Sequence, residues 1–145
     1  MDLYDAMHTS ASGLSAQRLR MNLISANLAN VNTTRTPEGG PYRRKEVVFS
    51  AVPKGASFRD HLKARPAKAP CEVRPLKIIE DQRPAVVKYA PHHPDANPEG
   101  YVALPQINVM EEMVNMISAS RSYQNNVEVL NTSKSLLAKT LGIGN

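Results

Sequence analysis

Apolar positions recur every seven residues along the C-terminal part of the chain. Residues 106–141 contain no glycine or proline, and two columns alternate through them at spacings of four and three. The columns are Val109, Met116, Tyr123, Leu130 and Leu137, and Met113, Ser120, Val127, Lys134 and Leu141. A 4-3 pattern held for about five heptads is typical of a helix packed lengthwise against other helices. We expect one long helix, with Pro105 in its first turn and a glycine stop at Gly142 followed by Ile143.

The first 33 residues repeat this pattern more weakly. The columns are Met7, Leu14, Met21 and Leu28, and Leu3, Ser10, Gln17, Ile24 and Val31. Asp2 and Asp5 favour a helix start, where backbone donors lack partners and the helix dipole favours negative charge. Residues 9–15 (TSASGLS) include poor helix formers such as Gly13. We therefore expect this second helix to be frayed or broken there.

The middle of the chain cannot form long helices, because all eleven prolines lie between Pro37 and Pro105. Proline inside a helix removes a backbone donor and clashes with the preceding turn, at a cost of about 3 kcal/mol. Residues 42–52, 71–79 and 85–89 are rich in β-branched and aromatic residues and are predicted strands. Residues 101–104 are a candidate fourth strand, and residues 53–70, which lack periodicity, are expected to form a mobile loop.

The predicted fold class is therefore α+β. Long N- and C-terminal helices (1–33 and 106–145) pack as a coiled-coil-like hairpin, with a small β-rich middle region (34–105). Two helices alone leave much of each seam exposed, so the seams either pack on the middle region or assemble with helices of other subunits. The candidate assembly seam consists of Leu3, Met7, Leu14, Met21, Ile24, Leu28, Val31, Val109, Met113, Met116, Tyr123, Val127, Leu130, Leu137 and Leu141.

Composition argues against several other classes of protein. The net charge of +5 is interleaved with acidic residues, and the only basic triple, Arg43 to Lys45, is interpreted as a solvated strand edge. A nucleic-acid-binding module remains an alternative. The single cysteine, Cys71, excludes an intramolecular disulfide and is expected to be a buried strand residue. His92, His93 and Asp95 favour a surface loop over a metal site.

No motif predicts catalysis, a cofactor or a metal, so an enzyme is not expected. No apolar run is long enough to cross a membrane, and no secretory leader precedes the first helix. We therefore expect neither direct membrane insertion nor standard cleavable export.

Several segments resemble the bacterial flagellar axial proteins, the family of rod, hook and hook-associated proteins. Residues 25–34 (SANLANVNTT) are similar to the signature of that family, whose core here is Ser25, Ala26, Asn27, Leu28, Ala29 and Asn30. Residues 37–49 (PEGGPYRRKEVVF), 91–105 (PHHPDANPEGYVALP) and 112–130 (EMVNMISASRSYQNNVEVL) are similar to its proximal rod members.

This resemblance implies a structural role. Such proteins pass unprocessed through the flagellar type III apparatus, and their paired terminal helices pack around a narrow channel. The implied location is the rod of the basal body, in the periplasmic space, where the rod transmits torque and encloses the export path. The implied partners are other copies, other rod proteins, rod-base and export-gate components and the export machinery, without nucleic acid. A cytoplasmic helical-bundle adaptor is the alternative from another class.

Two polar features are candidates for contacts between subunits. The amides of Asn22, Asn27, Asn30 and Asn32 either fix the register between subunits or, for Asn30 and Asn32, terminate the helix. Arg121 has no acidic residue four positions away, so it either reaches another subunit or is solvated.

Overall fold

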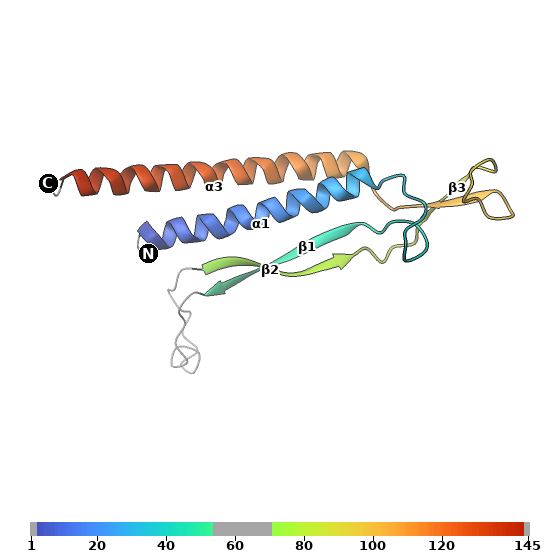
Figure 1. The fold of residues 1–145 in the computed structure, drawn as a ribbon, viewed down its shortest axis with the longest axis horizontal. Coiled ribbons are helices and arrows are strands. Elements are labelled where there is room, and N and C mark those ends of the chain that lie inside the picture. The colour runs from blue at the N-terminus through green and yellow to red at the C-terminus, as the bar shows by residue number, and fades with distance from the viewer. Residues whose placement is uncertain (1–2, 54–70, 144–145) are drawn as a thin grey trace, which may run out of the picture.

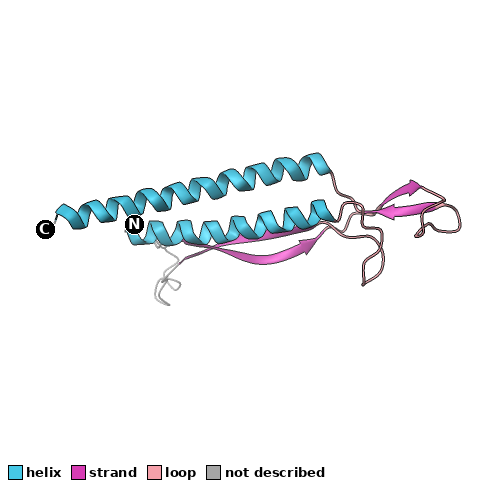
Figure 2. Ribbon diagram, turned by 45° about the horizontal axis from the view of Figure 1, so that its top comes forward, coloured by secondary structure: helices cyan, strands magenta, loops and turns pink. Residues whose placement is uncertain are grey.

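Two long antiparallel helices lie side by side and two β-hairpins accompany them (Figures 1 and 2). The structure, a computed structural model, describes residues 3–53 and 71–143. Helix α1 spans Leu3–Ala29 and helix α3 spans Val109–Ile143. The strands are β1 (Lys45–Pro53), β2 (Cys71–Glu80), β3 (Val86–Tyr89) and β4 (Tyr101–Leu104). The predicted α+β class, with long terminal helices and a small β-rich middle, is confirmed.

Helix α1 is continuous, so the predicted break at residues 9–15 is wrong. The poor helix formers are stabilised by packing against other elements. Ser10 is buried, and a Cβ atom added to Gly13 would lie 3.2 Å from Asn126 Nδ2 on α3. The absence of a side chain at Gly13 therefore lets the two helices approach closely, and this contact offsets its poor helix propensity.

The ends of the helices differ in part from expectation. Helix α3 starts at Val109 rather than near Pro105, because Asn108 caps it: Asn108 Oδ1 accepts a hydrogen bond of 3.0 Å from the backbone N–H of Met110. The predicted glycine stop is wrong, since α3 continues through Gly142. Helix α1 ends as one alternative proposed, because both the backbone N–H and the side-chain amide of Asn30 donate to the carbonyl of Ala26.

The four predicted strands are present, with bounds that agree within three residues. Strands β1 and β2 form an antiparallel hairpin in which Lys45 pairs with Glu80, with a register shift between Val48 and Phe49. Strands β3 and β4 form a second hairpin, in which Val86 pairs with Leu104. Residues 54–70, which include nearly all of the expected mobile loop, lie outside the described residues.

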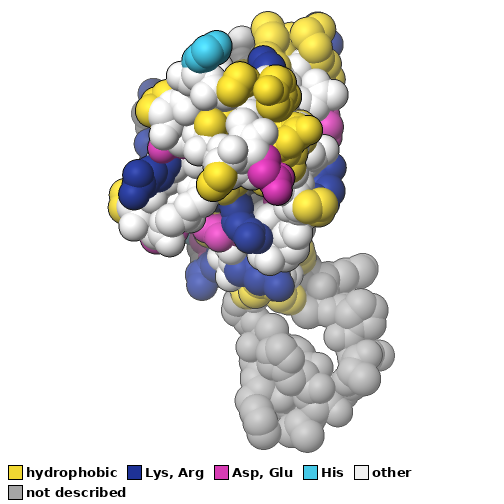
Figure 3. Space-filling model, turned by 90° about the vertical axis from the view of Figure 1, so that its right-hand side faces the viewer, with side chains coloured by type: hydrophobic (Ala, Val, Ile, Leu, Met, Phe, Trp, Pro, Cys, Tyr) yellow, Lys and Arg dark blue, Asp and Glu magenta, His cyan; other side chains and the backbone are white. Residues whose placement is uncertain are grey.

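The two hairpins occupy different places on the helix pair. The β1–β2 hairpin lies along α1, which is the only described element that it contacts. The β3–β4 hairpin lies beyond the end of the helices, and Figure 3, viewed from that end, shows hydrophobic side chains mixed with charged ones at the surface. Cys71 is exposed in β2, so the prediction of a buried cysteine is wrong. The reason is that the described part of the chain places no second layer over the β1–β2 hairpin.

Candidate assembly surface and the polar junction beneath it

Small and polar side chains fill the interface between the two helices. On α3 the buried positions Glu112, Ala119 and Ser133, with the half-buried Asn126, follow a seven-residue spacing. On α1 the buried positions are Ser10, Ala16, Ile24 and Asn27. Small residues such as Ala119 and Ser133 allow a close approach of the two helix backbones. Apart from Ile24, the large apolar side chains described on the two helices are half-buried or exposed.

The predicted seam is therefore spread over three environments. Ile24 is buried, whereas Val109, Met113, Leu137 and Leu141 are exposed. The remaining members are half-buried: Leu3, Met7, Leu14, Met21, Leu28, Val31, Met116, Tyr123, Val127 and Leu130. The α3 column through Met116, Tyr123 and Leu130 flanks the buried positions, and the column through Met113 and Val127 lies farther from α1.

Two groups of large apolar side chains are exposed on α3. The outer patch consists of Met110, Met113, Val114 and Ile117, and Met110 is 70% exposed. The C-terminal patch consists of Leu136, Leu137 and Leu141, and Leu141 is 74% exposed. The outer patch lies near the hairpin end of α3, whereas the C-terminal patch lies where α3 extends past α1 (Figure 1). Contiguous exposed apolar surface of this kind marks an interaction site.

Sequence reasoning missed three members of the outer patch, Met110, Val114 and Ile117. Their signal was nevertheless present, because residues at i, i+3, i+4 and i+7 from Met110 share one face of a helix. The heptad columns of residues 109–141 include only Met113 of this shorter apolar group. Arg121 is exposed one turn after Ile117, and its contact with another subunit stays a prediction.

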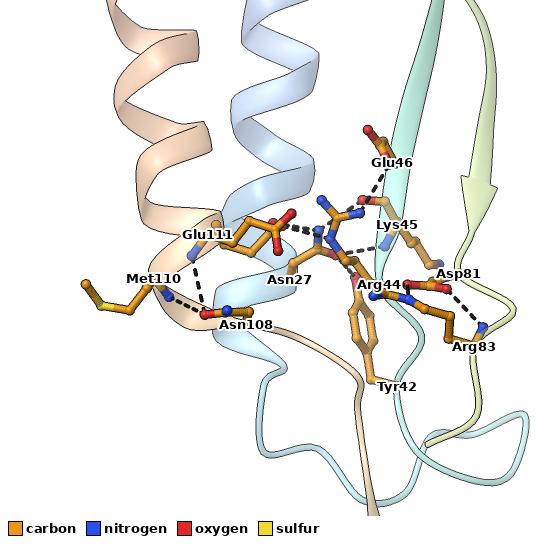
Figure 4. Close-up of polar contacts among 11 residues, drawn as sticks. Asn27, Tyr42, Arg44, Lys45, Glu46, Asp81, Arg83, Asn108, Met110 and Glu111 are labelled. Carbon is orange, nitrogen blue, oxygen red and sulfur yellow. Dashed lines mark hydrogen bonds and ion pairs between the residues drawn. The ribbon is translucent and has the colours of Figure 1, made fainter. Parts of the chain in front are cut away.

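Asn27 lies at the centre of a buried polar junction (Figure 4). Its Nδ2 donates hydrogen bonds to the carbonyl of Lys45 at 2.9 Å and to Glu112 Oε2 at 3.0 Å. Its Oδ1 accepts hydrogen bonds from the backbone N–H of Lys45 at 2.9 Å and from the hydroxyl of Tyr42 at 3.1 Å. Asn27 is 1% exposed, and these four bonds use the full capacity of an amide. The amide of Asn27 is therefore fully used within the subunit, and a contact of Asn27 with another subunit stays a prediction. Asn22 and Asn32 are exposed.

Glu112 carries the negative charge of this junction. Its second carboxylate oxygen, Oε1, accepts a hydrogen bond of 2.8 Å from Arg44 Nε. Glu112 is 1% exposed and the side chain of Arg44 is 16% exposed. Arg44 also donates to Glu46 Oε2 at 3.1 Å. A carboxylate this deeply buried needs both a counter-charge and hydrogen-bond donors, and Arg44 and Asn27 supply them.

The junction also perturbs two titrating groups. Burial alone would lower the pKa of Arg44, but the hydrogen bonds and charges of Glu112 and Glu46 together raise it. Burial raises the pKa of the Tyr42 phenol, an effect that Lys45 partly opposes and that Glu80 and Glu112 reinforce. Arg44 stays cationic and Tyr42 stays neutral at ordinary pH, as their hydrogen bonds require.

Sequence reasoning did not identify Glu112 or Arg44 as junction residues. The basic triple was interpreted as a solvated strand edge, whereas Arg44 is largely buried. The missed signal is an acidic residue at the buried position of a seven-residue series through Ala119 and Asn126. A carboxylate at such a position predicts a buried cationic partner elsewhere in the chain.

The histidine loop has a structural role in the described residues. The Asp95 carboxylate accepts a hydrogen bond of 2.7 Å from Thr34 Oγ1, and His93 Nδ1 accepts one of 3.1 Å from the backbone N–H of Asp95. Asp95 therefore connects the β3–β4 loop to the segment that follows α1.

Within residues 3–53 and 71–143, neither helix has a stretch that is apolar for long enough to cross a membrane.

Comparison with known proteins connects both helices to one biological structure. Residues 7–35 match the family model described as flagella basal body rod protein, and residues 99–143 match the model described as flagellar basal body rod FlgEFG protein C-terminal. The first match covers most of α1 with the asparagine motif. The second covers β4 and α3, including the outer patch and the C-terminal patch.

Full-length relatives give a narrower assignment. The chain is 43% identical to the flagellar basal-body rod protein FlgC of Borreliella burgdorferi, over 99% of this chain and 98% of the relative. It is 44% identical to FlgC of Yersinia enterocolitica and 42% identical to FlgC of Bacillus subtilis, over 99% of both chains in each comparison. Identity at this level over whole chains, with the rod models matching both terminal helices, shows that the chain belongs to the FlgC family of flagellar basal-body rod proteins.

Proposed function

We propose that this structural rod subunit assembles with copies of itself and with other rod proteins through the exposed faces of its helix pair. The observation that supports the proposal most directly is the distribution of apolar side chains on α3. The buried positions on α3 are Glu112, Ala119 and Ser133, whereas the outer patch and the C-terminal patch are left without a covering element in the described residues. An isolated subunit therefore presents several large apolar side chains of α3 to solvent.

The two patches lie toward opposite ends of α3, which suits end-to-end growth. Contacts between unlike surfaces of successive subunits do not close on themselves, and they generate a helical array. Burying one Leu or Met side chain in such a contact contributes about 1.5 to 3 kcal/mol. Many lateral contacts of this size, acting in parallel, would transmit torque along a hollow shaft that encloses the export path.

The finer features of the role follow from the family and from this surface. The subunit would be exported by the flagellar type III system without a cleaved leader and would join the rod in the periplasmic space. Its neighbours there would include rod-base and export-gate components. The role is structural, so it requires surface complementarity and stiffness rather than catalytic groups, a cofactor, nucleic acid or insertion into a membrane.

The test is electron microscopy of basal bodies from a deletion strain that is complemented with variant chains. Val114→Asn with Ile117→Gln makes the outer patch polar, and we expect rings without completed rods. The matched control is Leu76→Gln, because Leu76 is a comparably exposed apolar residue on β2. We expect the control and the unmodified chain to restore rods. Normal rods with the patch variant would reject assembly through this surface, and normal rods in the uncomplemented deletion strain would reject the rod role itself.

A further inference from the structure

We propose that Asn27, Arg44 and Glu112 form a lock that fixes how the base of the β1–β2 hairpin sits against the helix pair. The three side chains come from three separate parts of the chain: the last turn of α1, the residue before β1 and the first turn of α3. Asn27 and Arg44 lie close together in Figure 4, and the buried Glu112 hydrogen-bonds to both. The proposal concerns the geometry of the single subunit and does not depend on how subunits assemble.

The link from α3 to the hairpin base runs through side chains. Among the described elements, the β1–β2 hairpin packs on α1 and makes no backbone-level contact with α3. The hydrogen bond of 2.8 Å between Arg44 Nε and Glu112 Oε1 bridges that gap. Glu112 thereby connects α3 both to α1, through Asn27, and to the start of β1, through Arg44.

Asn27 holds the start of β1 as a neighbouring strand would. Its side-chain amide exchanges two hydrogen bonds of 2.9 Å with the backbone of Lys45, one through the N–H and one through the carbonyl. This is the pattern of a hydrogen-bonded pair in an antiparallel ladder. Lys45 pairs with Glu80 of β2 on its other side, so the first residue of β1 is held from both edges.

A cleft lies beside the lock, between α1, β1 and α3. It has a volume of about 250 Å³, and its walls include Ile24, Val47 and Phe49 together with Arg44 and Glu112. The directional polar contacts therefore hold the start of β1 next to a gap in the apolar packing.

The far end of the hairpin has a separate and simpler attachment. Thr9 Oγ1 donates a hydrogen bond of 3.0 Å to the carbonyl of Cys71, and Ser12 Oγ accepts one of 3.0 Å from the backbone N–H of Val73. These two bonds involve neutral groups and the Thr9 bond is exposed to solvent, while His8 Nδ1 on α1 lies 3.6 Å from Glu72 Oε1 on β2. Opening the lock should therefore release the base of the hairpin while its far end stays attached to α1.

Electron–electron distance measurements between paired spin labels on the purified full chain test this proposal. Cys71→Ser serves as the background, so that only the introduced cysteines carry labels. Labels at Ser118→Cys on α3 and Lys77→Cys on β2 report the base of the hairpin, and both positions are exposed and therefore accessible to the label. Labels at Ala11→Cys on α1 and Ala51→Cys on β1, which are also exposed, report the far end. We expect one narrow distance distribution for each pair in the otherwise unmodified chain.

Two variants open the lock and one serves as the matched control. Glu112→Gln removes the charge at nearly constant volume, and Arg44→Met with Glu112→Leu replaces the pair by apolar side chains that preserve folding in many buried sites. In both we expect the base distribution to broaden and shift while the far-end distribution stays narrow. Arg83→Gln breaks an exposed contact with Asp81 nearby and should change neither distribution. A narrow, unshifted base distribution in the folded apolar double variant, with circular dichroism confirming its helix content, would overturn the proposal.

Discussion

The two ends of the helix pair are built on opposite principles. At the hairpin end, Asn27 and Glu112 are buried, and the amide of Asn27 and both carboxylate oxygens of Glu112 have partners within the chain. At the other end, α3 runs past α1, and every described side chain after Ser133 is exposed, including three leucines. The buried polar groups at the hairpin end therefore satisfy one another, whereas the large apolar side chains after Ser133 have no covering element among the described residues.

The largest effect on stability is expected at the polar junction, from Arg44→Ala. This change leaves the buried Glu112 without its counter-charge, and such losses reduce the free energy of unfolding by about 3–5 kcal/mol. Urea denaturation followed by circular dichroism measures the effect. Arg83→Ala, which removes an exposed contact with Asp81, should leave the midpoint almost unchanged. Equal effects of the two substitutions would contradict a special role for the Arg44–Glu112 pair.

A second test concerns the middle of the helix pair, where the backbones approach closely. Gly13→Leu would force a side chain into the space occupied by Asn126, and overpacking of this kind costs about 1–3 kcal/mol. The same substitution at the exposed Ser15 should stabilise the helix slightly, since leucine is the better helix former. Thermal unfolding of both variants separates packing from helix propensity. If Gly13→Leu unfolds at the same temperature as the parent chain, the close approach does not limit the fold.

The sequence predicted the elements better than their faces. The lack of proline in residues 106–141 and the heptad columns were sufficient for α3, and β-branched residues were sufficient for the strands. The buried face was not predictable from apolar periodicity, because Ala119, Asn126 and Ser133 hold the centre while Met110 and Val114 are exposed. Thr9 and Ser12 are poor helix formers, and the contacts that stabilise them in α1 were also not predictable. Their partners, Cys71 and Val73, lie about sixty residues away in the chain, and local propensity contains no information about such contacts.

The polar junction was likewise only partly predictable from the sequence. The sequence pointed to Asn27, but its four partners depend on where Tyr42, Lys45 and Glu112 are brought by the fold. The triple that contains Arg44 gave no indication that its central residue is buried and the flanking Arg43 exposed. Long-range packing of α3 determines which charge is desolvated, and neither the composition nor the spacing of these residues encodes it.

A third and smaller effect should appear at alkaline pH. The pKa of Tyr42 is raised above its ordinary value of 10.0, mainly by burial. A group whose pKa is higher in the folded state contributes stability that is complete below the unfolded pKa and is lost as the pH rises through the folded pKa. The stability of the junction should therefore decline above about pH 10, where the Tyr42 phenol loses the proton that it donates to Asn27. Unfolding free energies between pH 9 and about pH 11 should show this decline more steeply than in Tyr42→Phe, and parallel curves would exclude it.

The smallest effect on the stability of the isolated subunit is expected in the C-terminal patch. It tests most sharply the comparison between this patch and the polar junction. Leu141→Ser alters a side chain of the C-terminal patch that is 74% exposed. Surface substitutions usually change the free energy of unfolding by no more than about 0.5 kcal/mol. We expect an unchanged unfolding midpoint for the purified chain but a loss of motility in a complemented deletion strain, because the burial of Leu141 would occur only in the assembled rod. Arg44→Ala should show the reverse emphasis, with a large loss of stability in the isolated chain. If Leu141→Ser destabilises the isolated chain, then the end of α3 has a partner within its own subunit. If it leaves both stability and motility intact, the C-terminal patch does not take part in assembly and the outer patch remains the surface to test.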